Sequence, residues 1–205
     1  MRLPLSLAVA QPRCVPGDMR ANGRRHARAV RDAGARIVVF PELSLTGYEL
    51  DAALVEPDDV ALEPIVPACR STGSMALVGA PVPGPDGQAY IAMLAVRPDG
   101  VAVLYRKQWT GGDEATRFSP GDEPAVTEVD GWRIGVGICR DTGIGAHVEQ
   151  MAALDIDVYV AGLVHRADEL SEQETAGSSA IWSPAGDVLA QAGMMPGDVA
   201  RATLE

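Results

Sequence analysis

The chain has 205 residues, of which 47% are hydrophobic and 22% are charged, and its formal net charge is −11. This length and composition are typical of a globular chain with enough apolar residues for a core, and they predict a single domain over residues 1–205. The negative charge argues against nucleic-acid binding, which needs concentrated lysine and arginine, and no apolar run is long enough to span a bilayer. Neither a nucleic acid nor a membrane is therefore expected as a partner.

The amino-terminal half alternates predicted strands with predicted helices. Strands are expected over residues 5–10, 36–40 and 75–80. Asp18 is a candidate N-cap for a helix that ends near Gly34. A second helix is expected over residues 57–71, although Pro64 and Pro67 within this range make its course doubtful.

The carboxy-terminal half contains three predicted hairpins, of which the first is marked by an Arg-Pro-Asp-Gly turn. Hairpin strands are expected over residues 89–96 with 101–106, 124–129 with 132–139, and 178–183 with 188–192. A polar loop over 107–123, a helix over 148–154, a strand over 158–164 and an extended tail over 199–204 complete the prediction. This mixture of strand–helix units and hairpins predicts an α/β layered fold with mixed sheets.

The three cysteines are widely spaced, at Cys14, Cys69 and Cys139, and no Cys-x-x-Cys pair is present. Such a set suggests neither a disulfide framework nor a zinc site, and it fits a reducing cytoplasm. The first ten residues resemble a truncated signal peptide, but Pro4 and Ser6 interrupt their apolar stretch, so a first strand is expected there instead.

Three predicted strands end on chemically distinct side chains. Glu42 follows Val-Val-Phe-Pro, Lys107 follows Leu-Tyr-Arg, and Cys139 follows Gly-Val-Gly-Ile. If these strands neighbour one another, the three groups open into one cleft. The carboxylate can then accept the thiol proton to give the nucleophilic thiolate, and the ammonium can stabilise the oxyanion that forms when the thiolate attacks. The same carboxylate can protonate a leaving amine and activate water.

These residues lie in motifs that resemble the three signatures of the nitrilase superfamily of carbon–nitrogen hydrolases. The motifs are Phe-Pro-Glu-Leu at 40–43, Tyr-Arg-Lys at 105–107 and Gly-Ile-Cys-Arg-Asp at 137–141, in the order Glu, Lys, Cys. Residues 114–121 and the predicted hairpin over 177–186 are similar to two further stretches of the family.

The resemblance implies a four-layer α-β-β-α sandwich that usually pairs into a homodimer or a larger assembly, with no metal or organic cofactor. It also implies roles for individual residues. Cys139 is the nucleophile, Glu42 is the general base and acid, and Glu114 orients the lysine and the substrate. Lys107 and the backbone N–H of Arg140 hold the oxyanion, and the intermediate is a thioester that water hydrolyses.

Two loops depart from the family pattern. The family often has Lys-x-His-Leu where this chain has Lys-Gln-Trp-Thr from Lys107, and Arg140 stands where an aromatic residue is common. These loops face the substrate, so the departures concern specificity. Tyr48 and Trp109 are candidates to line the pocket, although each could simply pack. The acidic composition disfavours an anionic substrate unless Arg140 or another arginine clamps a carboxylate.

The leading hypothesis is a hydrolase that cleaves a small amide or an N-carbamoyl compound through a Cys139 thioester. Nitrile hydrolysis is the alternative within the enzyme class. A catalytically idle family member that serves as a binding or assembly protein, and a thiol redox sensor with a second cysteine near Cys139, are alternatives from other classes. His147 lies eight positions after Cys139 and invites a Cys–His dyad, but no partner pattern supports it.

The stretch after the predicted strand over 158–164 is short for the family. Gly177 comes sixteen positions after Ala161, where the family normally places a helix and a strand that need roughly 17 residues plus loops. The tail after Val199 is also short. A true deletion around residues 165–176 would expose apolar surface, so residues missing from the numbered chain are the favoured explanation.

Overall fold

The computed structural model of the chain describes residues 2–85, 87–163 and 177–205, which contain two mixed β-sheets. The first sheet consists of β1 (Leu5–Ala10), β2 (Ile37–Val39), β3 (Met75–Pro83), β4 (Ala89–Arg97), β5 (Gly100–Arg106) and β11 (Val199–Leu204). The second consists of β6 (Ala125–Val129), β7 (Trp132–Ile138), β8 (Val158–Gly162), β9 (Ala180–Trp182) and β10 (Val188–Gln191). The strand orders are β11-β1-β2-β3-β4-β5 and β10-β9-β8-β7-β6.

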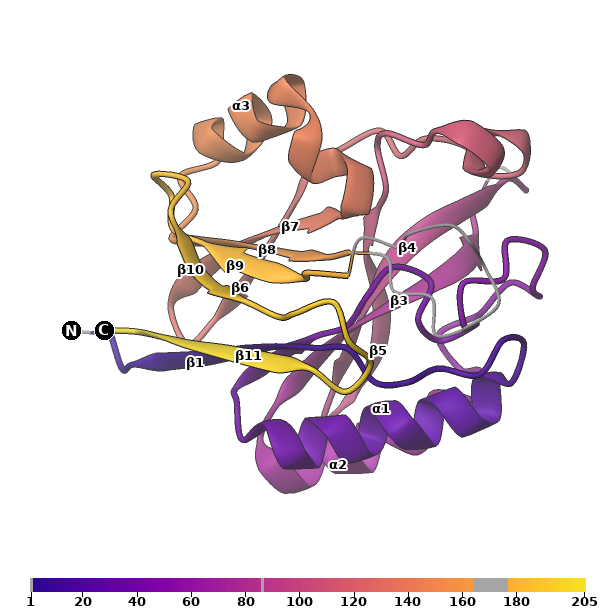
Figure 1. Ribbon diagram of the computed structural model, residues 1–205, viewed down its shortest axis with the longest axis horizontal. Helices are drawn as coiled ribbons and strands as arrows, with labels where there is room; N and C mark the ends of the chain where they lie inside the picture. Colours follow the sequence, from indigo (N-terminus) through magenta and orange to yellow (C-terminus); the bar gives the residue numbers. More distant parts are fainter. Residues whose placement is uncertain (1, 86, 164–176) are drawn as a thin grey trace.

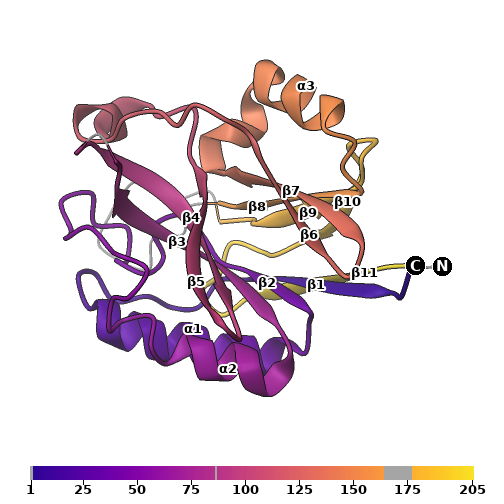
Figure 2. The same cartoon turned by 180° about the vertical axis from the view of Figure 1, so that it is seen from behind.

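Helices cover the outer faces of the two sheets (Figures 1 and 2). The described helices are α1 (Met19–Ala33), α2 (Ile65–Thr72), α3 (Gly145–Ala153) and two short 3-10 helices, η1 (Gly112–Thr116) and η2 (Cys139–Gly143). α1 and α2 pack on the first sheet and α3 lies over the second. One apolar cluster fills the space under α1 and α2, and another fills the space between the sheets. The predicted four-layer α-β-β-α sandwich is therefore confirmed.

The ends of α1 agree with the sequence prediction. The Asp18 carboxylate accepts a hydrogen bond from the backbone N–H of Ala21 at 2.9 Å, and Gly34 closes the helix in the left-handed conformation, at φ 60°. The helix predicted over 57–71 is wrong in its first half, because α2 begins only at Ile65, directly after Pro64. Pro67 is accommodated in the first turn, where the missing N–H has no helical partner to lose.

Three other boundaries differ from the prediction. β3 continues to Pro83 because it pairs with the whole of β4, and α3 begins at Gly145. The predicted tail over 199–204 is the edge strand β11, which pairs antiparallel with β1. The shortened segment predicted around 165–176 lies outside the described residues. No helix among the described residues is long and apolar enough to cross a membrane.

Glycines allow the turn after β2 to lie between the two sheets. A Cβ atom on Gly79 of β3 would stand 2.2 Å from the carbonyl oxygen of Pro41 and 2.7 Å from the amide nitrogen of Leu43. A Cβ atom on Gly162, at the end of β8, would stand 2.1 Å from the carbonyl oxygen of Phe40. These distances are far below van der Waals contact, so a side chain at either position requires the backbone of the turn to move.

We predict that Gly79→Ala lowers the free energy of unfolding by about 1–3 kcal/mol, because the added methyl group forces the turn that carries Glu42 away from β3. Urea denaturation measures this change. The matched control is Gly145→Ala, where an added Cβ meets no heavy atom within 4 Å and the change is expected to stay within about 0.5 kcal/mol. Equal effects of the two substitutions would contradict the steric argument.

Candidate active site

Glu42, Lys107 and Cys139 meet at one end of the sandwich, although the strands that precede them are not neighbours. β3 and β4 separate β2 from β5 in the first sheet, and β7 belongs to the second sheet, so the three strands are not the neighbours that the sequence analysis considered as one possibility. The groups meet because the turn after β2 crosses β3 between the sheets. The Lys107 side chain extends from the end of β5 to this turn.

The Lys107 ammonium is buried between two carboxylates. Its Nζ donates to Glu42 Oε1 at 2.6 Å and to the two oxygens of Glu114, Oε1 at 2.9 Å and Oε2 at 2.7 Å. Lys107 is only 1% exposed, so hydration cannot stabilise its charge and the two carboxylates must do so. Burial alone lowers the pKa of Lys107, but the charge of Glu42 and the hydrogen bonds from Lys107 to both carboxylates raise it above its usual range.

The pKa of the Glu42 carboxyl group allows it to exchange a proton near neutral pH. Burial raises its pKa to about 7, while the charge of Lys107 opposes this rise. The Cys139 thiol is close enough to lower the pKa of Glu42 as well, which places the thiol beside this carboxyl group. The arrangement therefore joins a titratable carboxyl group, a fixed cation and a thiol.

Cys139 is held by its backbone in an uncommon conformation. It is the first residue after β7 and begins η2, with φ 43° in the left-handed region that non-glycine residues seldom occupy. The Thr142 hydroxyl donates to the carbonyl oxygen of Cys139 at 2.8 Å. Such conformations persist where the surrounding structure fixes them, and they occur often at functional sites. The half-buried Cys139 thiol is thereby presented at the end of a buried strand.

The two candidate pocket residues differ in their surroundings. Tyr48 lines the cleft beside Glu114, where burial and the charges of Glu42 and Glu114 raise the pKa of its hydroxyl. Trp109 instead packs edge-on against His147, with ring centroids 5.2 Å apart. The structure thus favours pocket lining for Tyr48 and packing for Trp109.

The structure does not contain the Cys–His dyad. The ring nitrogens of His147 pair with Gln108 Oε1 at 3.2 Å and with the Tyr159 hydroxyl at 3.0 Å. Burial lowers the pKa of His147 to about 4, which keeps the ring neutral at physiological pH. His147 is therefore a packing histidine behind the candidate site.

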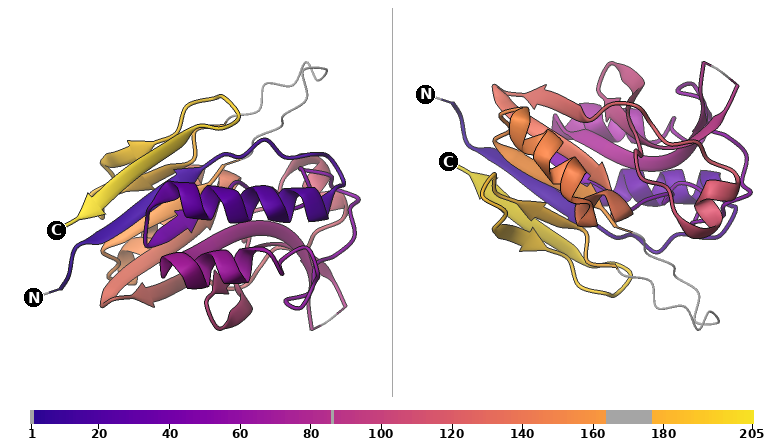
Figure 3. Two further views of the ribbon diagram at one scale, coloured as in Figure 1. Left: turned by 90° about the horizontal axis from the view of Figure 1, so that it is seen from below. Right: turned by 90° about the horizontal axis from the view of Figure 1, so that it is seen from above.

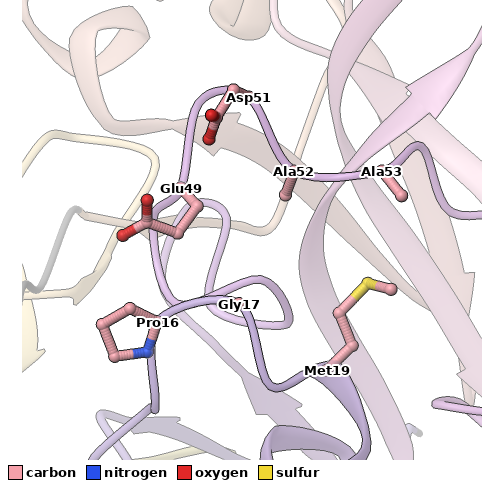
Figure 4. A pocket seen from close by; sticks show the side chains of 7 residues that line it. All are labelled: Pro16, Gly17, Met19, Glu49, Asp51, Ala52 and Ala53. Atoms are coloured by element: carbon pink, nitrogen blue, oxygen red, sulfur yellow. The ribbon is translucent and has the colours of Figure 1, made fainter.

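A cleft of about 370 Å³ opens beside Glu114. It is lined by Tyr48, Glu49, Leu50, Asp51, Gly111, Asp113 and Glu114, with no basic residue in this set. Arg140 is exposed at its edge, and its guanidinium lies against the backbone of Gly111. A second cleft, of about 380 Å³, lies beside the same loop and shares Glu49 and Asp51, and Figure 4 shows their carboxylates together with Met19 of α1.

The acidic loop of the first cleft is fixed by an arginine on the opposite side. The Arg117 guanidinium donates to the backbone carbonyl oxygens of Leu50 and Ala52, the latter at 2.6 Å. Arg117 therefore holds the loop through its main chain, and among the described residues no ion pair involves the carboxylates of Glu49 and Asp51. Sequence reasoning did not single out Arg117, because its partners are carbonyl groups far away along the chain.

The described residues contain no group of three or more His, Cys, Asp or Glu side chains that could hold a metal ion. Sequence reasoning also gave no separate role to Asp141, although this residue closes the third motif. The structure places it among buried polar groups behind Cys139, where it is 0% exposed.

The layered fold and the Glu–Lys–Glu cluster beside a thiol agree with the arrangement that the sequence motifs predicted. The carbon–nitrogen hydrolase family matches residues 6–157. The chain therefore belongs to the carbon–nitrogen hydrolase family, and the resemblance seen in its motifs is confirmed.

Individual relatives include both amidases and larger synthetases. The glutamine-dependent NAD(+) synthetase of Aquifex aeolicus is 28% identical over 161 residues, which cover 73% of this chain and 28% of the relative. The (R)-stereoselective amidase of a Pseudomonas species is 28% identical over 165 residues, 73% of this chain and 60% of the relative. The chain thus spans less than two thirds of either relative. The crystal structure of an amidase from Nesterenkonia sp. has the same fold, with a TM-score of 0.77 at 21% identity over 98% of this chain and 90% of that chain.

We predict that Lys107→Met leaves a folded protein whose free energy of unfolding falls as pH rises from about 5 to about 8, more steeply than in the wild type. Without the cation, burial raises the Glu42 pKa further above its unfolded value, so the folded state binds more protons and loses stability as this group ionises. Urea denaturation at the two pH values measures the slope. The control is Arg28→Met, which removes an exposed pair with Asp32 and should change little at either pH. A pH-independent stability of Lys107→Met would contradict the argument.

Proposed function

We propose that this carbon–nitrogen hydrolase cleaves a small amide or an N-carbamoyl compound through a thioester on Cys139. The observation that carries the proposal is the contact of one buried ammonium, Lys107, with two carboxylates beside the thiol. The carboxyl group of Glu42 lies beside the Cys139 thiol, and burial raises its pKa to about 7, which suits a group that must both accept and return a proton.

For a primary amide the proposed chemistry has two stages. Cys139 Sγ attacks the carbonyl carbon while Glu42 takes the thiol proton. The tetrahedral intermediate then breaks its C–N bond, Glu42 protonates the leaving nitrogen, and ammonia departs from a thioester. Water attacks the thioester carbon and gives a proton to Glu42, which returns it to the departing sulfur. The products are a carboxylic acid and ammonia, and the enzyme is regenerated.

The negative charge on the substrate oxygen needs donors in both stages. Lys107 supplies a fixed ammonium, and the backbone N–H of Arg140 follows directly after the nucleophile. Donors that are already in place lower the barrier because they need no reorganisation during the reaction. The two hydrogen bonds from Lys107 to Glu114 keep the ammonium in position, which supports the orienting role that we assign to Glu114.

We infer that the cleft beside Glu114 receives the acyl group, although Cys139 is not part of its lining, and that its charge favours an uncharged or cationic acyl group. Glu49, Asp51 and Asp113 line it with Glu114, while the nearby Arg140 lies outside its lining. Two relatives named above are amidases, which supports an amide as the bond that is cleaved. Amides that carry a carboxylate are therefore expected to be the poorest substrates, unless Arg140 binds them.

The decisive experiment is intact-protein mass spectrometry during incubation with neutral, cationic and anionic amides, carbamoyl amino acids and nitriles. We expect a transient mass gain with ammonia release from neutral or cationic amides, and no gain with Cys139→Ala. Reaction of nitriles alone would replace the amidase proposal by a nitrilase. Absence of any adduct across the panel would favour a catalytically idle binding protein.

We predict that kcat/KM falls as pH decreases through about 7. Only deprotonated Glu42 can take the thiol proton, and burial raises the pKa of this group to about 7. The pH dependence of kcat/KM measures the midpoint of this acid limb, and intrinsic fluorescence over the same range verifies that the protein stays folded. A midpoint below about 5, where an ordinary glutamate titrates, would contradict the role of Glu42.

The other two cysteines favour hydrolysis over redox sensing, and they agree with a cytoplasmic location. We include this location and a homodimeric state in the proposal. Cys69 lies in α2 beneath the first sheet, and burial raises its pKa to about 11. Burial likewise raises the pKa of Cys14 to about 12. Neither thiol therefore has the low pKa expected of a resolving cysteine that would form a disulfide with Cys139.

A further inference from the structure

The Asp141 carboxylate is buried and accepts hydrogen bonds from three segments of the chain. Its Oδ2 accepts from the Tyr105 hydroxyl at 2.8 Å and from the backbone N–H of Ile138 at 2.9 Å. Its Oδ1 accepts from the backbone N–H of Trp109 at 3.2 Å. A single side chain thus joins the end of β5, the loop after β5 and the end of β7.

Two of these contacts fix the backbone around Lys107. Tyr105 lies two residues before Lys107 and Trp109 lies two residues after it, so Asp141 holds the chain on both sides of the lysine. The Tyr105 hydroxyl also accepts a hydrogen bond from the backbone N–H of Gln108 at 3.2 Å. The position of the Lys107 backbone is therefore set by the Asp141 carboxylate, which does not contact the Lys107 ammonium.

The third contact fixes the backbone around the nucleophile. Ile138, the last residue of β7, precedes Cys139 directly, and its N–H donates to the side chain of Asp141 in the short helix η2 that follows. Thr142 holds the carbonyl oxygen of Cys139 from the other side. Asp141 and Thr142 thus keep Cys139 at the positive φ that its position requires.

The three donors match an ionised carboxylate, which accepts hydrogen bonds and donates none. Burial raises the pKa of Asp141, and the hydrogen bonds from Tyr105, Ile138 and Trp109 act against this rise. All three hydrogen bonds can form at once only if neither carboxylate oxygen carries a proton directed at a donor. A neutral amide at this position cannot accept all three, because its NH₂ group faces one of the donors.

We propose that Asp141 is a positioning residue that locks the Lys107 loop to the Cys139 loop and so sets the distance between ammonium and thiol. This inference rests on the proposed function for its effect on turnover. The reactivity of the thiol itself depends on the same distance, because a nearby cation stabilises the thiolate. Thiol reactivity therefore tests the lock without a known substrate.

The test compares wild type with Asp141→Asn. In the variant the amide oxygen can still serve Tyr105 and Ile138, while the NH₂ group faces the N–H of Trp109 and breaks the link to the lysine loop. A displacement of about 1 Å can cost a factor of about 100 in rate, so we expect kcat to fall about 100-fold with KM within about threefold. We also expect the rate of Cys139 alkylation by iodoacetamide to fall by about tenfold, with its pH dependence moved to higher pH.

Two further variants separate positioning from general stability. Ser74→Ala removes a buried hydrogen bond of 2.6 Å to the carbonyl oxygen of Ala35, at the other end of β3, and should lower the melting temperature without changing kcat or alkylation. Tyr105→Phe removes one of the three donors and should lower kcat about fivefold to tenfold with KM unchanged.

A folded Asp141→Asn variant with wild-type kcat and alkylation rate would overturn the proposal that Asp141 holds the Lys107 loop and the Cys139 loop together. If Asp141→Asn does not fold, Tyr105→Phe decides in its place, and unchanged kcat and alkylation in that variant would overturn the inference. A wild-type protein that hydrolyses no amide would count against the proposed function only. The alkylation rates of wild type and variants would still support or overturn the lock.

Discussion

The buried charge of Lys107 is the constraint on which the candidate site depends. An ammonium group that loses its hydration must be surrounded by acceptors, and this chain supplies two carboxylates from separate segments. Glu42 comes from the turn between β2 and α2, and Glu114 comes from η1. The turn after β2 and the loop after β5 therefore have to come together. Burial of Glu42 between them raises the pKa of its carboxyl group, although the charge of Lys107 opposes this rise.

The backbone conformation allows the turn that carries Glu42 to approach β3 and β8 so closely. Gly79 and Gly162 leave room for the turn that carries Glu42, and each would clash with it if it had a side chain. On the opposite sheet, Cys139 adopts a conformation that other residues avoid, and its neighbours hold it there. The chemistry of the site thus depends on glycines and main-chain hydrogen bonds as much as on the reactive groups.

The sequence drew attention to three groups that the fold brings together, because the signals of these groups are local. A carboxylate, an amine and a thiol each follow an apolar strand, and such a break in an apolar run can be recognised without knowledge of the fold. The limits of α1 were equally local, since Asp18 and Gly34 act within one turn. The helix predicted over 57–71 began too early, because Pro64, which the sequence analysis treated as a residue inside the helix, directly precedes α2.

Long-range arrangements could not be predicted in the same way. The order of strands in the two sheets depends on pairings between distant segments, so the separation of β2 from β5 and the pairing of β11 with β1 had no local signal. Asp141 was missed for a related reason. Its three partners lie in segments that only the folded chain brings together, and a lone aspartate after Cys-Arg predicts none of them.

The pairing of β1 with β11 has a practical consequence. β1 runs parallel to β2, so its first residue lies at the end of the sheet opposite to Glu42, and β11 returns to that same end, where Leu204 faces Leu5. Both ends of the described chain therefore lie together, as Figure 3 shows, and the strand directions place them away from the reactive groups. An affinity handle or a surface tether at either end would immobilise the protein with its reactive groups turned away from the support.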